Sequence, residues 1–250
     1  MNFFLNMEKE IIKREILRIA ALTDRGQRLN QLIAPIYKDK LEDIKRLVKE
    51  LEKYSTKANK ENLSGEWELI FSNVELFRSS PFFLAIEEAL DNEFKSNLFF
   101  KLHQLQIGSF GISTIGRVSQ IIDFEEDKFI STFDTTLFGL TVIPIIGWFK
   151  LFPTFGGRVI TLANNISLEE NIIKMILQKT KVIEVNGLNK IPLLSSLLMD
   201  RWYPVNMIWN KLPWNKKPPS CKLKVSFIDE DFRITKDIYD SIFIYTKLKT

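Results

Sequence analysis

Alternation of apolar and polar residues is the dominant pattern in the chain after residue 60. In residues 66–71 it would place Trp67, Leu69 and Phe71 on one face of a strand, because successive side chains of a strand point to opposite faces. Residues 222–227 alternate in the same way and would turn their apolar side chains inward: Leu223, Val225 and Phe227. Both runs predict strands with one buried face.

Further strand-like runs follow with short turns between them, at 97–107, 113–122, 128–137, 141–151, 158–163, 168–177, 179–185, 232–237 and 241–247. Because regularly spaced strands without intervening helices favour antiparallel pairing, we expect an antiparallel barrel. The most apolar run, 137–152, contains Pro144 and Lys150 and is shorter than the roughly 20 residues that a membrane-spanning helix needs. We interpret it as two strands and a turn.

Helical spacing of apolar residues precedes the strands. It occurs in residues 8–22, which Gly26 can terminate, and again in residues 40–54. We therefore predict an N-terminal helical hairpin and linker over residues 1–60 and a barrel domain over residues 61–250. The hairpin could serve as a lid or brace on the barrel, or as a pair of partner-binding helices. A third helix is expected at 81–90, with Ser80 as its cap, and it could gate the barrel mouth.

Four short segments occur along the chain in a recognisable order. They are Leu-Thr-Asp-Arg-Gly at 22–26, Leu-Ser-Gly-Glu-Trp-Glu-Leu-Ile-Phe-Ser at 63–72, Phe-Arg-Ser-Ser-Pro-Phe-Phe at 77–83, and Asp-Glu-Asp-Phe-Arg-Ile-Thr-Lys at 229–236. Together they resemble the plastid lipid-associated protein family, also called fibrillins or plastoglobulins. The resemblance implies a mainly β (α+β) fold, a lipocalin-like antiparallel β-barrel with the N-terminal helical hairpin.

The resemblance also implies a function without enzymatic chemistry. It implies binding or carriage of a carotenoid, a prenylquinone or another lipid, with the protein associated peripherally with a thylakoid or plastoglobule. We expect the ligand-binding site to be lined by Trp67, Leu69, Phe71, Phe100, Leu102, Leu223, Val225 and Phe227. Gly65-Glu66-Trp67 has the Gly-x-Trp form that begins the first strand of a lipocalin-like barrel. The resemblance places Arg233 at the position of a basic residue that stacks on this tryptophan. We therefore expect Trp67 and Arg233 to close one end of the barrel.

An alternative class is an interaction protein. The chain has 20 phenylalanines, and these could fill the barrel while the outer surface docks a membrane enzyme or an enzyme of isoprenoid synthesis. A hollow barrel would favour carriage, and a filled one would favour docking.

The segment 188–220 interrupts the strand rhythm and is rich in proline and tryptophan. Tryptophan beside lysine is typical of a membrane-interface anchor. We therefore expect peripheral membrane contact through Trp209, Trp214, Lys211, Lys216 and Lys217. The alternative is that these aromatic side chains fold back as a plug on the barrel.

Composition narrows the remaining classes. At 45% hydrophobic and 26% charged, the chain suits a single barrel domain with an appendage. One cysteine and one histidine, His103, offer neither a disulfide nor the usual zinc set, and a histidine-based catalytic site would depend on His103 alone. We place His103 on the solvent side of a strand and expect no enzyme. The net charge of +4 is spread along the chain, with no basic-aromatic signature for nucleic acid.

The first residues lack the basic flank of a signal peptide, and Glu8 and Glu10 argue against a transit peptide. We therefore expect the protein to be made where it works, on the cytoplasmic side of a cyanobacterial membrane or in a plastid stroma.

Overall fold

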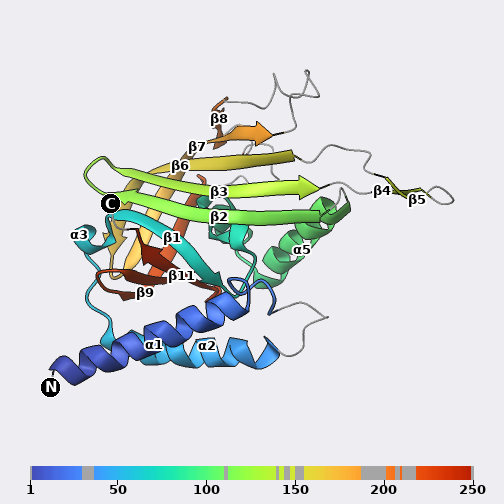
Figure 1. The fold of residues 1–250 in the computed structure, drawn as a ribbon. Helices are drawn as coiled ribbons and strands as arrows, with labels where there is room; N and C mark the ends of the chain where they lie inside the picture. The colour runs from blue at the N-terminus through green and yellow to red at the C-terminus, as the bar shows by residue number, and fades with distance from the viewer. Residues whose placement is uncertain are drawn as a thin grey trace.

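A nine-stranded antiparallel sheet forms the centre of the molecule and closes on itself (Figure 1). The computed structural model describes residues 2–29, 37–109, 112–138, 141–143, 147–149, 155–186, 201–205, 209 and 218–248. The strands of the barrel are β1 (Gly65–Ser72), β2 (Ile112–Asp123), β3 (Lys128–Phe138), β6 (Phe155–Glu169), β7 (Ile172–Asn186), β9 (Ser220–Ile228), β10 (Phe232–Lys236) and β11 (Ile242–Lys247). Their order is β6-β3-β2-β1-β11-β10-β9-β7, and pairing of β6 with β7 closes the ring. This is the up-and-down meander of a small barrel.

The β6–β7 hairpin is longer than the sequence pattern indicates. Three strands were expected between residues 158 and 185, and the structure has two, because the turn falls at Glu170 and Asn171. Both residues have positive φ, 47° and 66°, as a tight hairpin turn requires. Near its start β7 pairs with β9, and further along Lys179 and Thr180 pair with β8 (Tyr203–Pro204) instead. Pairing between β7 and β9 is therefore confined to Ile172–Ile176 of β7.

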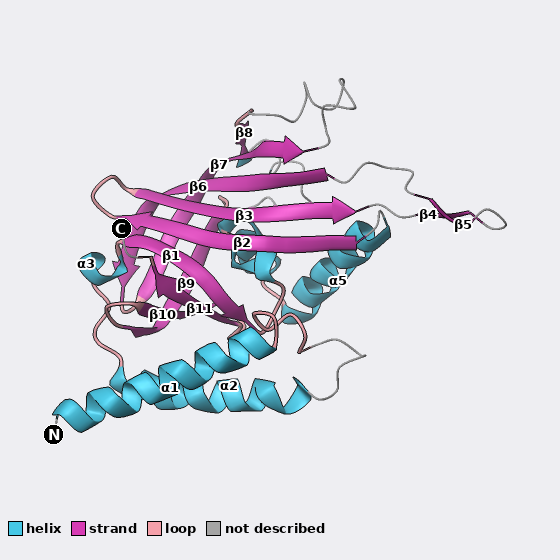
Figure 2. Cartoon of the chain, in the orientation of Figure 1, coloured by secondary structure: helices cyan, strands magenta, loops and turns pink. Residues whose placement is uncertain are grey.

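Helices cover one side and both ends of the barrel, as Figure 2 shows. The N-terminal hairpin consists of α1 (Asn2–Leu22) and α2 (Lys38–Leu51), and the short elements η2 (Glu52–Tyr54) and α3 (Lys60–Leu63) lead from it into β1. Between β1 and β2 lie η3 (Leu76–Ser79), α4 (Pro81–Leu90) and α5 (Glu93–Ser109). The run 137–152 contains a separate two-stranded sheet of β4 (Thr141–Ile143) and β5 (Gly147–Phe149).

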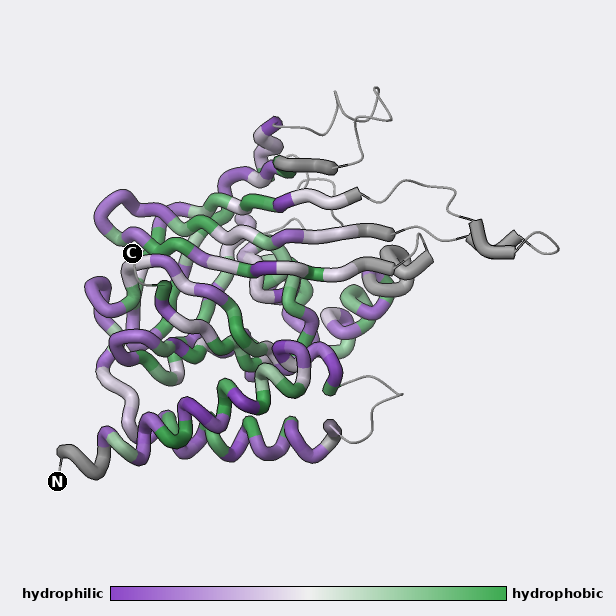
Figure 3. The backbone as a smooth tube through the Cα atoms, viewed as in Figure 1, coloured by the Kyte–Doolittle hydropathy of each residue, from purple (hydrophilic) through white to green (hydrophobic). Residues whose placement is uncertain are grey.

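The hairpin packs on the outer face of β1, β9, β10 and β11. Hydrophilic and hydrophobic residues alternate along α1 in Figure 3, and the apolar side chains lie against the sheet. The shared cluster joins Ile16, Ile19, Ile44, Val48 and Leu51 of the helices to Phe71, Phe227, Ile234 and Ile244 of the strands. The hairpin thus braces the barrel wall from outside.

Charged and polar contacts of Lys13 and Arg25 fix α1 to the barrel. Lys13 Nζ lies 3.0 Å from Asp229 and 2.6 Å from Asp231, in the turn that leads into β10. Three residues beyond the last residue of α1, Arg25 donates to the carbonyl oxygens of Ile115 and Gly116 at 2.8 and 2.6 Å. Gly26 has a φ of +90°, and a Cβ there would lie 1.9 Å from the Ser72 carbonyl oxygen. The Thr-x-Arg-Gly segment therefore has a structural role, since it holds the end of α1 against β1 and β2.

Candidate functional site

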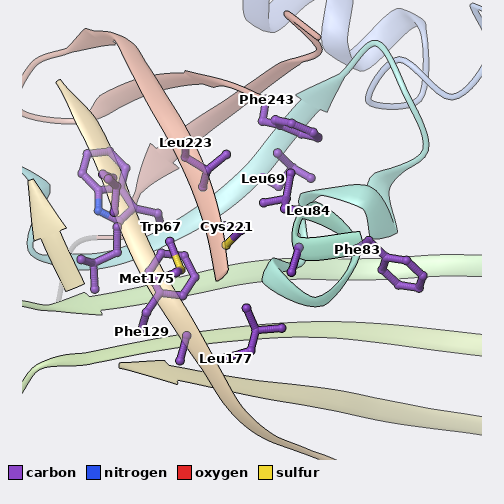
Figure 4. Packing of buried hydrophobic residues seen from close by; sticks show 14 of the residues in the cluster. Trp67, Leu69, Phe83, Leu84, Phe129, Met175, Leu177, Cys221, Leu223 and Phe243 are labelled. Carbon is purple, nitrogen blue, oxygen red and sulfur yellow. The ribbon is translucent and has the colours of Figure 1, made fainter. Parts of the chain in front are cut away.

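The interior of the barrel is the candidate site, and its walls come from strands on opposite sides of the ring. Trp67 and Leu69 of β1 face Leu223 and Val225 of β9, each at most 4% exposed. Phe129, Met175, Leu177 and Cys221 belong to the same cluster as these walls and as Leu84 of α4 (Figure 4). The predicted lining residues found in this cluster are Trp67, Leu69, Phe100, Leu223 and Val225.

Phe71 and Phe227 do not line the interior, so this part of the sequence prediction is wrong. The pairing register shifts between Leu69 and Phe71 in β1, and again where β9 pairs with β10 beyond Val225. A β-bulge adds one residue to a strand and moves the side chains beyond it to the opposite face. Both phenylalanines consequently pack under the N-terminal hairpin.

Residues 97–107 form most of α5 and not the strand that was expected. Phe100 is buried on its inner face, whereas Leu102 is 56% exposed and lines no cavity wall. The helix also presents Phe94 and Leu98 outward, 76% and 46% exposed. Because apolar residues stand on both of its faces, the helical period was hidden in the sequence.

The predicted gating helix is present as α4, between the same two residues. Pro81 begins it, and the buried face consists of Phe83, Leu84, Ala85 and Ile86. The helix contacts β6, β7 and β9, so it lies against the inner walls of the barrel. In this conformation α4 and the wall side chains occupy the described interior.

An aromatic cluster connects α4 with α5 and η3. His103 lies 5.3 Å from both Phe77 and Phe83, and Phe99 stacks on it at 6.2 Å between ring centroids. Burial lowers the pKa of His103. The expected solvent-side position on a strand is therefore wrong, and the histidine is a half-buried member of the cluster.

A buried carboxyl group fastens α4. Glu87, 1% exposed, lies 2.5 Å from the Arg78 guanidinium and accepts a hydrogen bond from Ser96 Oγ at 3.3 Å. The Asp237 carboxyl at the β10–β11 turn lies close enough to act on it electrostatically. Burial and the nearby Asp237 charge raise the pKa of Glu87 to about 7.

The predicted contact between Trp67 and Arg233 is present at the α3 end of the barrel. The Arg233 guanidinium lies 4.8 Å from the Trp67 ring centroid and 4.3 Å from that of Tyr245. The Trp67 indole donates to the Leu63 carbonyl oxygen at 2.9 Å. Arg233 is thus held between two aromatic rings, an arrangement that favours a desolvated cation.

A polar chain extends from Arg233 toward α4. Arg233 Nη2 donates to Gln120 Oε1 at 2.6 Å. Gln120 Nε2 in turn donates to Tyr245 Oη at 3.0 Å and to the Ser79 carbonyl oxygen at 3.2 Å. Gln120 and Tyr245 were not predicted as site residues, although both stand opposite interior residues of β1 in the pairing register.

The predicted membrane anchor is contradicted at Trp209, the one of its residues that lies in the described part of the chain. Trp209 is 2% exposed and belongs to the interior cluster, so its ring is not free to enter a membrane. Trp214, Lys211, Lys216 and Lys217 lie outside the described residues. Trp202 is 38% exposed, with the Lys179 and Lys181 ammonium groups 4.6 and 4.9 Å from its ring centroid.

The described residues include no helix with the length and hydropathy needed to cross a bilayer. They also include no cluster of three or more histidine, cysteine or acidic side chains arranged to hold a metal ion.

No family model matches the sequence, and no curated protein matches it significantly. One solved structure, a lipocalin-like protein from Bacteroides uniformis, covers 75% of this chain and 99% of its own, with 13% identity and a TM-score of 0.25. The closed meander, with Gly-x-Trp at the first strand and an arginine on the tryptophan, shows the fold directly. The barrel is lipocalin-like.

Proposed function

We propose that this protein binds an apolar or amphipathic lipid inside its barrel and carries out no chemistry on it. The observation that supports this proposal most strongly is the way in which α4 packs at the open end of the barrel. A closed barrel with an apolar interior is covered there by α4, a short helix whose own buried face matches a ligand in polarity. Lipocalin-like barrels of this size can hold one small ligand.

Resemblance of the four sequence segments to plastid lipid-associated proteins supports a more specific proposal. The ligand would be a carotenoid, a prenylquinone or another thylakoid lipid. The protein would work peripherally at a thylakoid or plastoglobule, facing a plastid stroma or a cyanobacterial cytoplasm. Uptake requires α4 to leave the interior, because its side chains and the lipid compete for the same space.

Binding is testable by tryptophan fluorescence, since Trp67 lies in the wall of the site. Titration with a prenylquinone should quench the emission saturably, and Leu223→Phe should weaken binding because it narrows the interior. Ile238→Phe is the matched control, since Ile238 is 42% exposed. Quenching no greater than that of free tryptophan would argue against carriage.

Membrane contact is better assigned to α5 than to Trp209. Phe94, Leu98 and Leu102 recur every four residues and form an exposed apolar stripe, with Lys95 and Lys101 beside it. Such a helix can lie in the membrane interface, with its lysines near anionic headgroups. The stripe adjoins the mouth, so a lipid could pass between membrane and barrel.

Flotation with anionic liposomes tests this assignment. We expect Leu98→Ser/Leu102→Ser to reduce the bound fraction several-fold, because interfacial binding scales with buried apolar area. Leu17→Ser/Leu22→Ser is the matched control, since these leucines of α1 are 41% and 43% exposed. Equal flotation of both double variants and the parent would show that the stripe is not the anchor.

A docking function is the second candidate, and the packing of α4 side chains against the interior walls favours it. Met7 and Ile11 of α1 are 46% and 57% exposed, and Ile11 borders a groove with Leu47 of α2. In this alternative the barrel binds no lipid and the hairpin holds a membrane or isoprenoid-synthesis enzyme. Failure of the fluorescence titration together with retained flotation would favour it.

A further inference from the structure

Arg233 is a buried cation without a counter-ion among the described residues. Its side chain is 0% exposed, and no carboxylate in the described part of the chain pairs with it. Its Nε and Nη1 atoms have no hydrogen-bond partner among the described residues. Desolvation of an unpaired charge is costly, and stacking between two rings offsets only part of that cost. Burial lowers the pKa of Arg233 to about 10, so it stays protonated near neutral pH.

The direction of this side chain follows from the pairing register. Arg233 is opposite Tyr245 in β11, and Tyr245 is opposite Leu69 in β1. Residues directly opposite one another in a sheet share a face, so Arg233 stands on the interior face with Leu69. Gln120 is opposite Trp67 and shares that face as well. The interior therefore has apolar walls and a polar floor.

The segment just before α4 supplies one hydrogen-bond acceptor to this polar floor. The Ser79 carbonyl oxygen, two residues before α4, accepts a hydrogen bond from Gln120 Nε2. If α4 moves out and takes Ser79 with it, that N–H loses its acceptor. Three nitrogen atoms then have at least one N–H without an acceptor among the described residues: Gln120 Nε2, Arg233 Nε and Arg233 Nη1.

We infer that Arg233 and Gln120 form the site for the polar end of the ligand, and that this end is a carboxylate on a long apolar chain. This inference rests on the proposed binding of an amphipathic lipid, and it narrows that lipid to one with a carboxylate, which carotenoids and prenylquinones lack. The carboxylate accepts hydrogen bonds from the guanidinium and from Gln120 in place of the Ser79 carbonyl, and its charge compensates Arg233. The chain extends from the floor into the space that α4 vacates.

Three probes of equal chain length test the assignment: hexadecanoic acid, its methyl ester and hexadecanol, each displacing the neutral reporter phenylnaphthylamine from the parent protein. A hydrogen bond to a charged group contributes about 1.5–3 kcal/mol, so the acid should bind roughly 10- to 100-fold more tightly than the alcohol. The ester, a neutral acceptor, should lie between them. Arg233→Gln should abolish the preference for the acid, and Arg233→Lys should retain part of it.

Arg117→Gln is the matched control, because Arg117 is an exposed arginine that pairs with Glu66 and Glu68 on the outside of β1. It should keep the full preference. If Arg233→Gln fails to fold, the order of the three probes on the parent still decides the question. Equal binding of all three would overturn this inference and leave the proposed function intact. A preference that survives in Arg233→Gln would also overturn it, and binding of none would contradict the proposed function itself.

Discussion

Raising the pH from about 5 to about 8 should lower the free energy of unfolding, and Glu87→Gln should remove most of that loss. Glu87 has its pKa raised from 4.5 to about 7, because it is buried and faces Asp237. Between these values the folded protein keeps the Glu87 proton and the unfolded chain releases it. Stability therefore falls as pH rises through this window, by on the order of 3 kcal/mol.

The glutamine variant keeps the geometry of the contact. Its amide can donate to Asp237 Oδ2, which has no donor among the described residues, and can accept from Arg78. The protein should then lose less stability as the pH rises. His103, whose lowered pKa acts in the opposite direction over part of this range, is common to both proteins and cancels in the comparison.

Urea unfolding of the parent, Glu87→Gln and Glu88→Gln at several pH values measures the effect. Glu88 lies on the same helix but forms a partly exposed pair with Lys222, so its variant should follow the parent. Identical pH profiles for the parent and Glu87→Gln would show that Glu87 does not bind the proton. If the profile is as expected, α4 is held more weakly above about pH 7, and lipid exchange should accelerate there.

The barrel could be predicted from sequence because its signals are local. Alternation in β1 and β9, the proline at the start of α4 and the glycine before Trp67 each act within a few residues. Arg233 and Trp67 could be paired because the motif relates them, although they are far apart in the chain. The acceptor that Gln120 finds in Ser79 could not be predicted, since it depends on how α4 enters the barrel.

The bulges and α5 show where local pattern fails. A strand with Trp67, Leu69 and Phe71 alternates perfectly, yet Ile70 and Phe71 both pack against the hairpin cluster, because a bulge intervenes. Ile70, the one residue between Leu69 and Phe71, gives no sign of this bulge in the sequence. The prediction of membrane contact for Trp209 is wrong for a different reason. An amphipathic ring suits a protein core as well as it suits a membrane interface, and the sequence does not distinguish the two.

Phe227→Ala should destabilise the protein by about 3–5 kcal/mol and should loosen the N-terminal hairpin first. The ring is 0% exposed and lies 6.3 Å from that of Phe232, in the cluster shared with α1 and α2. Its loss leaves a cavity between helices and sheet. Amide hydrogen exchange should therefore increase in α1 and α2 before it increases in the barrel strands.

Leu223→Ala is the matched control, since Leu223 is equally buried in the same strand but faces the interior. It should cost about 2–5 kcal/mol, raise exchange in α4 and leave the hairpin protected. It should also change lipid affinity, whereas Phe227→Ala should not. If both variants loosen the hairpin alike, then Phe227 and Leu223 share a face, β9 has no bulge between them, and the interior is lined as simple alternation predicts.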